Sequence, residues 1–210
     1  MIELALIAAA WLVYGLIHSW LAASRVKGWI ERYRPDLAPA YRLAYNALAV
    51  LLVIPPLWLT LNHSGAALWH VPPWIAWPAA ALAVAGFVWS LRWYDMGEFL
   101  GLRQWRGRYG REHEGFVLSP LHRYVRHPWY SLGLLLLWTR DLNAAWLTTA
   151  VALTVYVLIG SQMEERKLIE RHGDAYRRYR ERVPGIIPWP GRRLSPAQAQ
   201  ALQQAARTGG

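Results

Sequence analysis

The chain has 210 residues, of which 55% are hydrophobic, and its formal net charge at pH 7 is +10. It contains no cysteine, which excludes disulfides, thiolate nucleophiles and cysteine metal sites. The distribution of charge argues against a soluble domain. Residues 43–91 contain no Asp, Glu, Lys or Arg, whereas one membrane helix needs only about 20 apolar residues.

Uncharged stretches of the sequence predict the membrane helices in chain order. A lipid-exposed segment can satisfy its backbone hydrogen bonds only as a helix, so each stretch is expected to form one. We therefore expect an all-α fold, an integral membrane helical bundle with about five transmembrane helices that include a short C-terminal helical hairpin. The expected spans are residues 1–22, 41–61, 73–91, 129–139 and 142–163.

The fourth of these segments is too short to cross a bilayer as a helix. Residues 129–139 give 11 uncharged positions, about half of the 20 that a crossing requires. Either the helix begins earlier and carries Arg123 and Arg126 toward the membrane interior, or the segment is the short half of a helical hairpin. Both alternatives put polar groups at membrane depth, which is costly and typical of a functional site. The plainer alternative is that both arginines extend to lipid headgroups.

Lysine and arginine are concentrated in alternate connections between the expected spans. Residues 23–42 carry five of them, residues 92–128 carry seven and residues 164–210 carry ten. The positive-inside rule then predicts an inner-membrane protein with its N-terminus outside and its C-terminus in the cytoplasm. The same rule accounts for the net charge of +10. No nucleic-acid-binding motif accompanies the basic residues, so we expect no nucleic-acid partner.

The chain continues past the last span as an amphipathic segment. Leu168, Ile169 and Tyr176 lie at helical spacing, and Gly173 is expected to interrupt this helix. Prolines exclude a regular helix over residues 184–190.

Several motifs of the second half occur together in a recognisable order. The run RHPWY at residues 126–130 precedes a hydrophobic hairpin, which is followed by a Glu-Glu pair at 164–165, a G-x-x-Y-x-x-Y pattern at 173–179 and RVPGIIP at 182–188. Together they resemble the integral-membrane methyltransferases of the isoprenylcysteine carboxyl methyltransferase family. That superfamily also includes phospholipid N-methyltransferases and bacterial methanethiol S-methyltransferases. The resemblance covers residues 98–188, while the first half looks like the small bacterial members and the NnrU-type membrane proteins.

The resemblance implies that S-adenosylmethionine is the cofactor and that polar and aromatic residues bind it. A helix that begins at Pro128 would offer its N-terminal N–H groups to the carboxylate of the methionine part. His127 and Arg126 would add charge-assisted hydrogen bonds, and Glu164 would bind the ribose hydroxyls or the ammonium group. The residues expected at cofactor positions are Gln104, Glu114, His122, Arg126, His127, Pro128, Trp129, Tyr130, Glu164, Tyr176 and Tyr179.

Each of these residues also has an ordinary structural explanation. Tyr130 could be an aromatic side chain at the membrane interface, and His127 could cap a helix. The pair Glu164-Glu165 could be a solvated helix end. Tyr176 and Tyr179 either cover the adenine or pack the terminal helix onto the membrane surface. The joint pattern, rather than any one residue, favours a cofactor pocket.

Departures from the family pattern bear on the methyl acceptor. His122 stands where a tyrosine is common, and Glu114 where a histidine often stands. Gly160 replaces the arginine that helps the prenylcysteine enzymes bind a substrate carboxylate, which argues against that substrate. A thiol is therefore the expected acceptor, ahead of a prenylcysteine-like carboxylate or a lipid amine. Because a thiol must lose its proton, Glu165 or His122 is the expected catalytic base.

We therefore expect a membrane methyltransferase that works in the lipid bilayer on a small thiol or lipophilic acceptor. Residues 1–97 would hold the first three helices and residues 98–190 the catalytic region. Residues 191–210 would be a tail that forms a short helix or is disordered. The alternative is a non-enzymatic, NnrU-like accessory protein with a vestigial pocket. No metal is expected, because the sequence has no HxxxH or HExxH pair.

Overall fold

Helices account for almost all of the regular structure in the computed structural model, which describes residues 2–63, 65–107 and 116–208. The chain divides into two units of similar size. Unit 1 comprises Met1–Pro72, Tyr94–Tyr109 and Arg140–Tyr156. Unit 2 comprises Pro73–Trp93, Gly110–Thr139 and Val157–Gly210.

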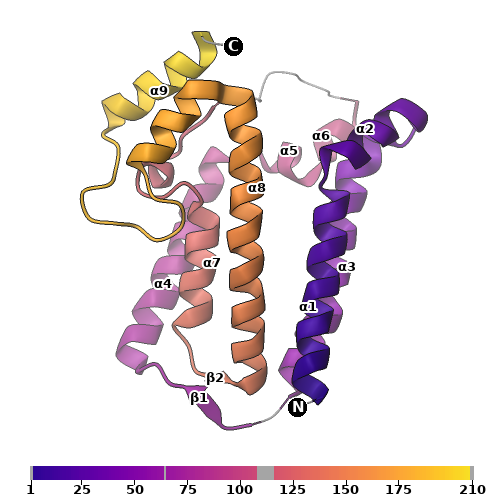
Figure 1. Ribbon diagram of the computed structural model, residues 1–210, viewed down its shortest axis with the longest axis vertical. Helices are drawn as coiled ribbons and strands as arrows, with labels where there is room; N and C mark the ends of the chain where they lie inside the picture. The colour runs from indigo at the N-terminus through magenta and orange to yellow at the C-terminus, as the bar shows by residue number, and fades with distance from the viewer. Residues whose placement is uncertain (1, 64, 108–115, 209–210) are drawn as a thin grey trace. The chain divides into compact units, whose positions relative to one another are not determined.

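Four helices are long and apolar enough to cross a membrane in the described part of the chain (Figure 1). They are α1 (Ile2–Leu21), α3 (Ala38–Asn62), α4 (Pro73–Ser90) and α8 (Ala144–Arg182). Many of their large apolar side chains remain exposed, as expected of helices that face lipid. The prediction of an all-α membrane bundle is confirmed, and each long span matches its expected start within a few residues.

The fourth predicted segment forms the short helix α7 (Pro128–Trp138). Its 11 residues reach about 16 Å at about 1.5 Å per residue, roughly half of the hydrocarbon thickness of about 30 Å. The helix begins at Pro128, whereas Arg123 lies in the separate 3-10 helix η3 (Pro120–Arg123). The short half of a hairpin is therefore the correct alternative, and the earlier start is wrong.

A chain of hydrogen bonds ties together the long helices of unit 1. The indole Nε1 of Trp11 donates to Thr149 Oγ1 at 3.0 Å, and the hydroxyls of Thr149 and Thr60 are 2.7 Å apart. Thr60 in turn donates to the carbonyl oxygen of Pro56 at 2.8 Å, so the hydroxyl of Thr149 must be the donor to Thr60. Ile7, Trp11 and Ala145 form the buried cluster beside this chain. Each polar atom at membrane depth thereby gains the partner that lipid does not supply.

Short elements complete unit 1 at both ends of its long helices. Strand β1 (Ala67–Trp69) pairs antiparallel with β2 (Leu142–Asn143), and Asp141 Oδ1 accepts the N–H of Val71 at 2.9 Å. The connection between α3 and α4 therefore lies beside the connection between α7 and α8, and these are the two connections with few basic residues. The remaining elements are α2 (Ser24–Tyr33), α5 (Met96–Leu100) and α6 (Leu102–Trp105).

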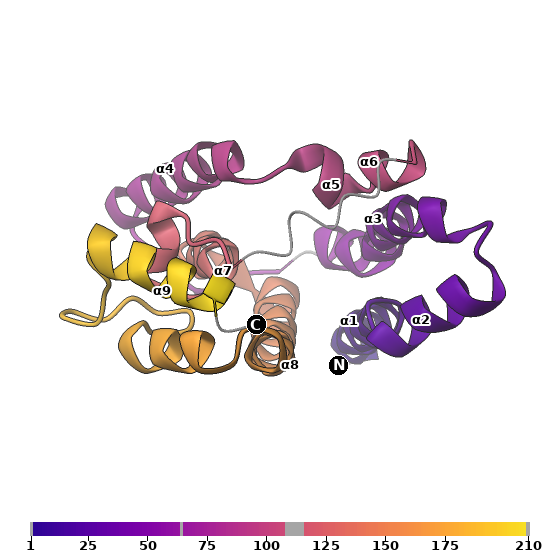
Figure 2. The ribbon, with the colours of Figure 1, turned by 90° about the horizontal axis from the view of Figure 1, so that it is seen from above.

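Unit 2 packs its last helix against the second part of α8. Gly173 interrupts α8 with φ 53° and ψ −129°, as predicted, and the chain then leaves regular helix between Arg182 and α9 (Pro196–Thr208). Figure 2 shows α9 beside the end of α8. The buried cluster that joins them consists of Phe116, Tyr176, Tyr179, Val183, Leu194, Ala199 and Leu202.

Gly15 provides a test of the packing in unit 1. A Cβ atom added at Gly15 would lie 2.9 Å from the ring of Tyr156. We therefore expect Gly15→Ala to destabilise the protein by about 1–3 kcal/mol through overpacking, measured as a lower thermal midpoint in detergent. Gly133→Ala is the matched control, because an added Cβ there meets no described atom within 4 Å. An equal midpoint for the two variants would contradict this packing.

Candidate functional site

In unit 2 the start of α7 lies close to the end of α4 and to the end of the apolar part of α8. The indole Nε1 of Trp129, in the first turn of α7, donates to Ser90 Oγ at the end of α4 at 2.9 Å. Tyr130, also in the first turn, donates its hydroxyl to Glu164 Oε2 at 3.4 Å. Glu164 directly follows the uncharged stretch of α8. The start of α7 and the ends of the apolar parts of α4 and α8 thus mark one boundary between apolar and charged residues.

Arg126 holds the segment that follows α8 against this boundary. Its Nε donates to Glu165 Oε1 at 2.8 Å, and its Nη1 donates to the carbonyl oxygen of Arg180 at 3.0 Å and to that of Val183. Its backbone N–H donates to the carbonyl of Pro184 at 2.9 Å. The Arg126 side chain is only 12% exposed. The structure therefore gives Arg126 a set of protein partners that account for most of its donors.

His127 joins the same cluster through both ring nitrogens. Its Nε2 lies 3.0 Å from Glu165 Oε1 and its Nδ1 lies 3.5 Å from Glu164 Oε2, while its side chain is 4% exposed. Its ring stacks on Tyr130 with 5.4 Å between ring centres. Two carboxylates facing the two nitrogens favour the doubly protonated ring, because both nitrogens are donors only in that form.

The surroundings of His122 and His127 shift the pKa values of these two side chains in opposite directions. Burial by itself would lower the pKa of His127, but the hydrogen bonds and charges of Glu164 and Glu165 outweigh it and raise this pKa above 6.5. For His122, burial together with the positive charge of His127 lowers the pKa to about 4, against a smaller opposing effect of Glu164. At neutral pH, His122 is therefore neutral, whereas His127 keeps its proton to a higher pH than a free histidine does.

His122 is also fixed by the loop that precedes it. Its Nδ1 accepts the backbone N–H of Ser119 at 3.3 Å and lies 2.7 Å from Ser119 Oγ. The Ser119 side chain in turn accepts the backbone N–H of His122, which completes a capping box at the start of η3. Its carbonyl oxygen accepts the hydroxyl of Tyr179 at 2.7 Å. Tyr176 and Tyr179 are 2% and 1% exposed in the cluster below α9, so their rings are covered by protein. Their expected contact with an adenine ring stays a prediction.

The remaining expected residues lie elsewhere or outside the described residues. Gln104 belongs to α6 of unit 1, and its Oε1 is buried without a hydrogen-bond partner among the described residues. Glu114 lies outside the described residues. Pro128 is buried at the first position of α7. Unit 2 thus brings together ten of the expected residues, which are His122, Arg126, His127, Pro128, Trp129, Tyr130, Glu164, Glu165, Tyr176 and Tyr179.

Several contacts of the site were not expected from sequence. The carbonyl of Gly185 accepts the backbone N–H of His127 at 3.0 Å, and Ser131 donates its hydroxyl to the carbonyl of Ile186. Arg180 Nε lies 3.7 Å from Glu165 Oε2. The RVPGIIP motif was visible as a pattern, but its role is to supply backbone acceptors, which no side-chain pattern reveals.

The site offers one half-exposed carboxylate beside a buried ion cluster. The side chain of Glu164 is 50% exposed and that of Glu165 only 10%. Glu164, the hydroxyl of Tyr130 and the first turn of α7 are thus the groups able to meet a ligand that has both cationic and anionic parts. Within the described residues, no group of three His, Asp or Glu side chains could hold a metal ion.

Comparison with known proteins gives matches over most of the chain. The methanethiol S-methyltransferase of Mycobacterium tuberculosis is 31% identical over 197 residues, which are 86% of this chain and 76% of that protein. The enzyme of the same name from Crocosphaera subtropica is 31% identical over 196 residues, covering 86% and 73%. Human nurim is 30% identical over 165 residues, covering 72% and 62%. No family model matches the chain, and no solved structure gives a significant match.

His122 and His127 should make the stability of the protein depend on pH in opposite directions. Because the pKa of His127 is raised, its contribution to stability is present below pH 6.5 and is lost as the pH rises through the raised value. Because the pKa of His122 is lowered to about 4, its contribution is present above pH 6.5 and is lost as the pH falls to about 4. Thermal midpoints in detergent between pH 4 and pH 9 (about the range in which these groups titrate) would measure both effects.

His122→Asn is the control for the loss of stability at acid pH. Asn retains an acceptor for Ser119 but does not titrate, so this variant should lose less stability than the wild type as the pH falls below about 6.5. An unchanged acid slope would show that His122 is not the group responsible.

Arg126→Lys tests the clamp on the segment after α8. Lysine keeps the charge but cannot reach Glu165 and the carbonyls of Arg180 and Val183 together. The loss of charge-assisted hydrogen bonds is expected to lower the free energy of unfolding by about 3 kcal/mol, measured from the unfolding midpoint. Arg177→Lys is the matched control, since Arg177 is 62% exposed and, within the described part of the chain, forms an ion pair with Asp174 alone; its effect should stay within about 0.5 kcal/mol. Equal effects of the two substitutions would contradict the clamp.

Proposed function

Because the chain belongs to the methanethiol S-methyltransferase family, we propose that it is a membrane enzyme that transfers a methyl group from S-adenosylmethionine to a small thiol. The observation that carries the proposal is the match of about 31% identity to enzymes of that name over 86% of the chain. The fold supports it, because the family motifs converge on one charged cluster at the end of apolar helices.

The residues present fit a donor that carries a carboxylate, an ammonium, a sulfonium and ribose hydroxyls. Glu164 is the half-exposed anion for the ammonium or the ribose, and the hydroxyl of Tyr130 lies beside it. The first turn of α7 would face the carboxylate, with the buried His127 beside it holding Glu164 and Glu165 in place. Gln104 belongs to unit 1 and its buried Oε1 has no donor among the described residues; its contact with the cofactor stays a prediction of the sequence. Glu114 remains a further candidate for the pocket.

Other expected residues would act through their neighbours. Arg126 positions Glu165 and the segment after α8. Trp129 fixes the start of α7 through Ser90, and Pro128 sets the direction of that helix. Tyr176 and Tyr179 support the site from the buried cluster below it. These are positioning roles rather than contacts with the reacting atoms.

The chemistry proposed for the site is an in-line methyl transfer. When bound, S-adenosylmethionine supplies an electrophilic methyl carbon, whose bond to the sulfonium sulfur breaks as a bond to the acceptor sulfur forms and yields a thioether. The protein must orient the acceptor and exclude water, which would otherwise solvate the thiolate. The boundary position of Tyr130 and Glu164 suits this task, since an apolar thiol reaches it from the bilayer.

The proton of the thiol needs an acceptor, and Glu165 and His122 remain the two candidates. Glu165 accepts hydrogen bonds from Arg126 and His127, so it must give up one of these to take a proton. The pKa of His122, lowered to about 4, makes it a weak base. A half-exposed site also admits a thiolate formed in water, in which case both residues are positioning groups.

The glycine at position 160 supports a neutral acceptor. An added Cβ atom there would meet no described atom within 4 Å, and glycine supplies no cation for a substrate carboxylate. We therefore propose a thiol ahead of a prenylcysteine-like carboxylate or a lipid amine. The non-enzymatic accessory role is retained only as the outcome of a failed binding test.

The proposed orientation places the site in the cytoplasm and the N-terminus outside. The alternation of basic and uncharged connections supports it. The pairing of β1 with β2 also supports it, because both belong to connections with few basic residues. The catalytic region would then be residues 98–190, with α9 packed on it.

Binding of S-adenosylmethionine by calorimetry in detergent tests the proposal. We expect saturable binding to the wild type and a loss of affinity of about tenfold or more in Glu164→Gln, because a hydrogen bond to a charged group is removed. Tyr130→Phe removes one hydroxyl and should have a smaller effect, while Tyr130→Ala should weaken binding strongly.

Glu170→Gln, six positions further along α8, is the matched control and should bind normally. If the folded wild type binds no S-adenosylmethionine, the methyltransferase proposal is wrong and the accessory role takes its place. Saturable binding should be followed by thioether formation from methanethiol and longer thiols, whereas a prenylcysteine should give no methyl ester.

A further inference from the structure

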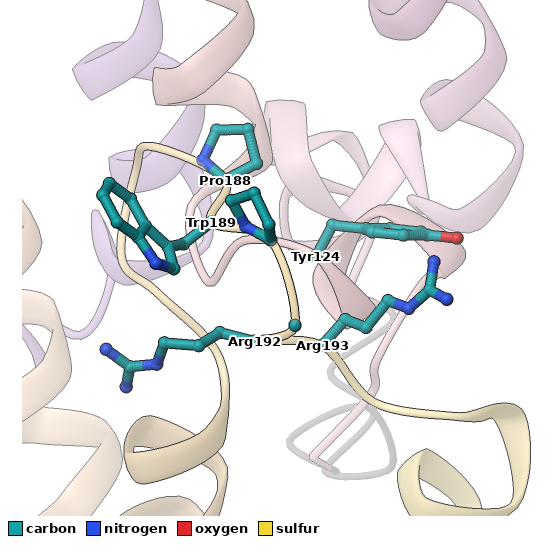
Figure 3. Close-up of a pocket in the computed structure, with 7 residues that line it drawn as sticks. Tyr124, Pro188, Trp189, Arg192 and Arg193 are labelled. Carbon is teal, nitrogen blue, oxygen red and sulfur yellow. The ribbon is translucent and has the colours of Figure 1, made fainter.

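The loop after α8 forms a pocket that has no part in the site described above. Its volume is about 360 Å³. Figure 3 shows the side chain of Arg193 extending toward Tyr124, while Arg192 points away on the other side. The lining residues are Tyr124, Pro188, Trp189, Pro190, Gly191, Arg192 and Arg193. All of them belong to unit 2.

The two adjacent arginines give this pocket an uncompensated positive charge. Several arginines form ion pairs among the described residues, among them Arg34, Arg103, Arg126, Arg177 and Arg180. Neither Arg192 nor Arg193 has a carboxylate partner there. Arg192 Nη2 donates to the carbonyl of Glu181 at 2.6 Å, which fixes its direction and leaves its charge unneutralised. The pocket therefore attracts an anion.

The loop is held at the boundary where the apolar helices of unit 2 end. The carbonyls of Pro184 and Gly185 accept the N–H groups of Arg126 and His127, directly before the first turn of α7. Three and four residues beyond Gly185, the chain enters the pocket. Because α7 is apolar from this point onward, the pocket lies at the depth of lipid headgroups.

Exposed apolar side chains accompany the arginines at this depth. Ile187 and Trp189 are 74% and 66% exposed, although burying such side chains in water-free surroundings is favourable. Tryptophan concentrates at membrane interfaces, where its ring meets both apolar and polar groups. An anchor of exposed apolar side chains next to basic ones is the combination that binds anionic lipid.

We propose that this pocket binds the glycerophosphate headgroup of an anionic phospholipid. Arg193 contacts the phosphate, Arg192 adds its positive charge from the other side of the loop (Figure 3), and Ile187 and Trp189 enter the interfacial layer beside it. A zwitterionic lipid fits less well, because its ammonium group adds positive charge next to two arginines. The volume is at the lower end of the range for ligand pockets, which suits a headgroup whose acyl chains stay in the bilayer.

Native mass spectrometry of the full chain in neutral detergent tests this proposal, with short-chain phosphatidylglycerol, short-chain phosphatidylcholine and inorganic phosphate as separate probes. We expect saturable binding of phosphatidylglycerol and weaker binding of the other two. Arg192→Gln/Arg193→Gln should lose about fivefold in affinity for each arginine. Trp189→Ala should lower the affinity for phosphatidylglycerol and leave that for inorganic phosphate unchanged.

Two control variants keep the test decisive. Arg177→Gln/Arg178→Gln removes the same charge from an exposed part of α8 and should bind like the wild type. Arg192→Lys loses the geometry of the bond to Glu181 but keeps the charge, so it should bind nearly normally. The proposal is wrong if the folded pocket variant binds phosphatidylglycerol like the wild type. It is also wrong if both double variants lose binding equally, or if inorganic phosphate binds as tightly as the lipid.

Discussion

Neutralisation of charge at the end of apolar helices is the constraint on which the site of unit 2 depends. Glu165, Arg126 and His127 have side chains that are 10%, 12% and 4% exposed. Charges so far from water are tolerated only when they are paired and hydrogen-bonded. Glu165 is therefore the common partner of both basic residues, and removing it would leave two buried basic side chains without their shared carboxylate.

This ion cluster also determines how the chain runs past it. The remaining donors of Arg126 bind carbonyls at the end of α8, and the backbone of residues 126–127 binds the two carbonyls that follow. The start of α7 and the segment after α8 are thereby fixed to each other. The shortness of α7 follows from the same arrangement, because its first turn must stay with the charged cluster while the rest is apolar.

A methyl transfer to an apolar thiol needs a place where a charged donor and a bilayer-soluble acceptor meet. The boundary occupied by Tyr130 and Glu164 is such a place in unit 2, since Glu164 is half exposed while Glu165 and His127 beside it are buried. The proposed lipid pocket lies along the same boundary. There the charged residues are Arg192 and Arg193, which attract an anion, instead of the carboxylate of Glu164, which attracts a cation. Both sites depend on polar side chains held at interface depth by apolar helices.

The sequence by itself determined the membrane helices, the break at Gly173 and the family, because these follow from uncharged length, local backbone preference and a set of ordered motifs. It also located most residues of the cluster. It did not decide between the two positions of α7, nor predict that Arg126 binds the chain after α8 rather than a ligand. Those outcomes depend on which donors meet which acceptors across some 40 to 60 positions of sequence. Only the tertiary structure decides them, because a buried charge selects its partner by proximity in space and not by spacing along the chain.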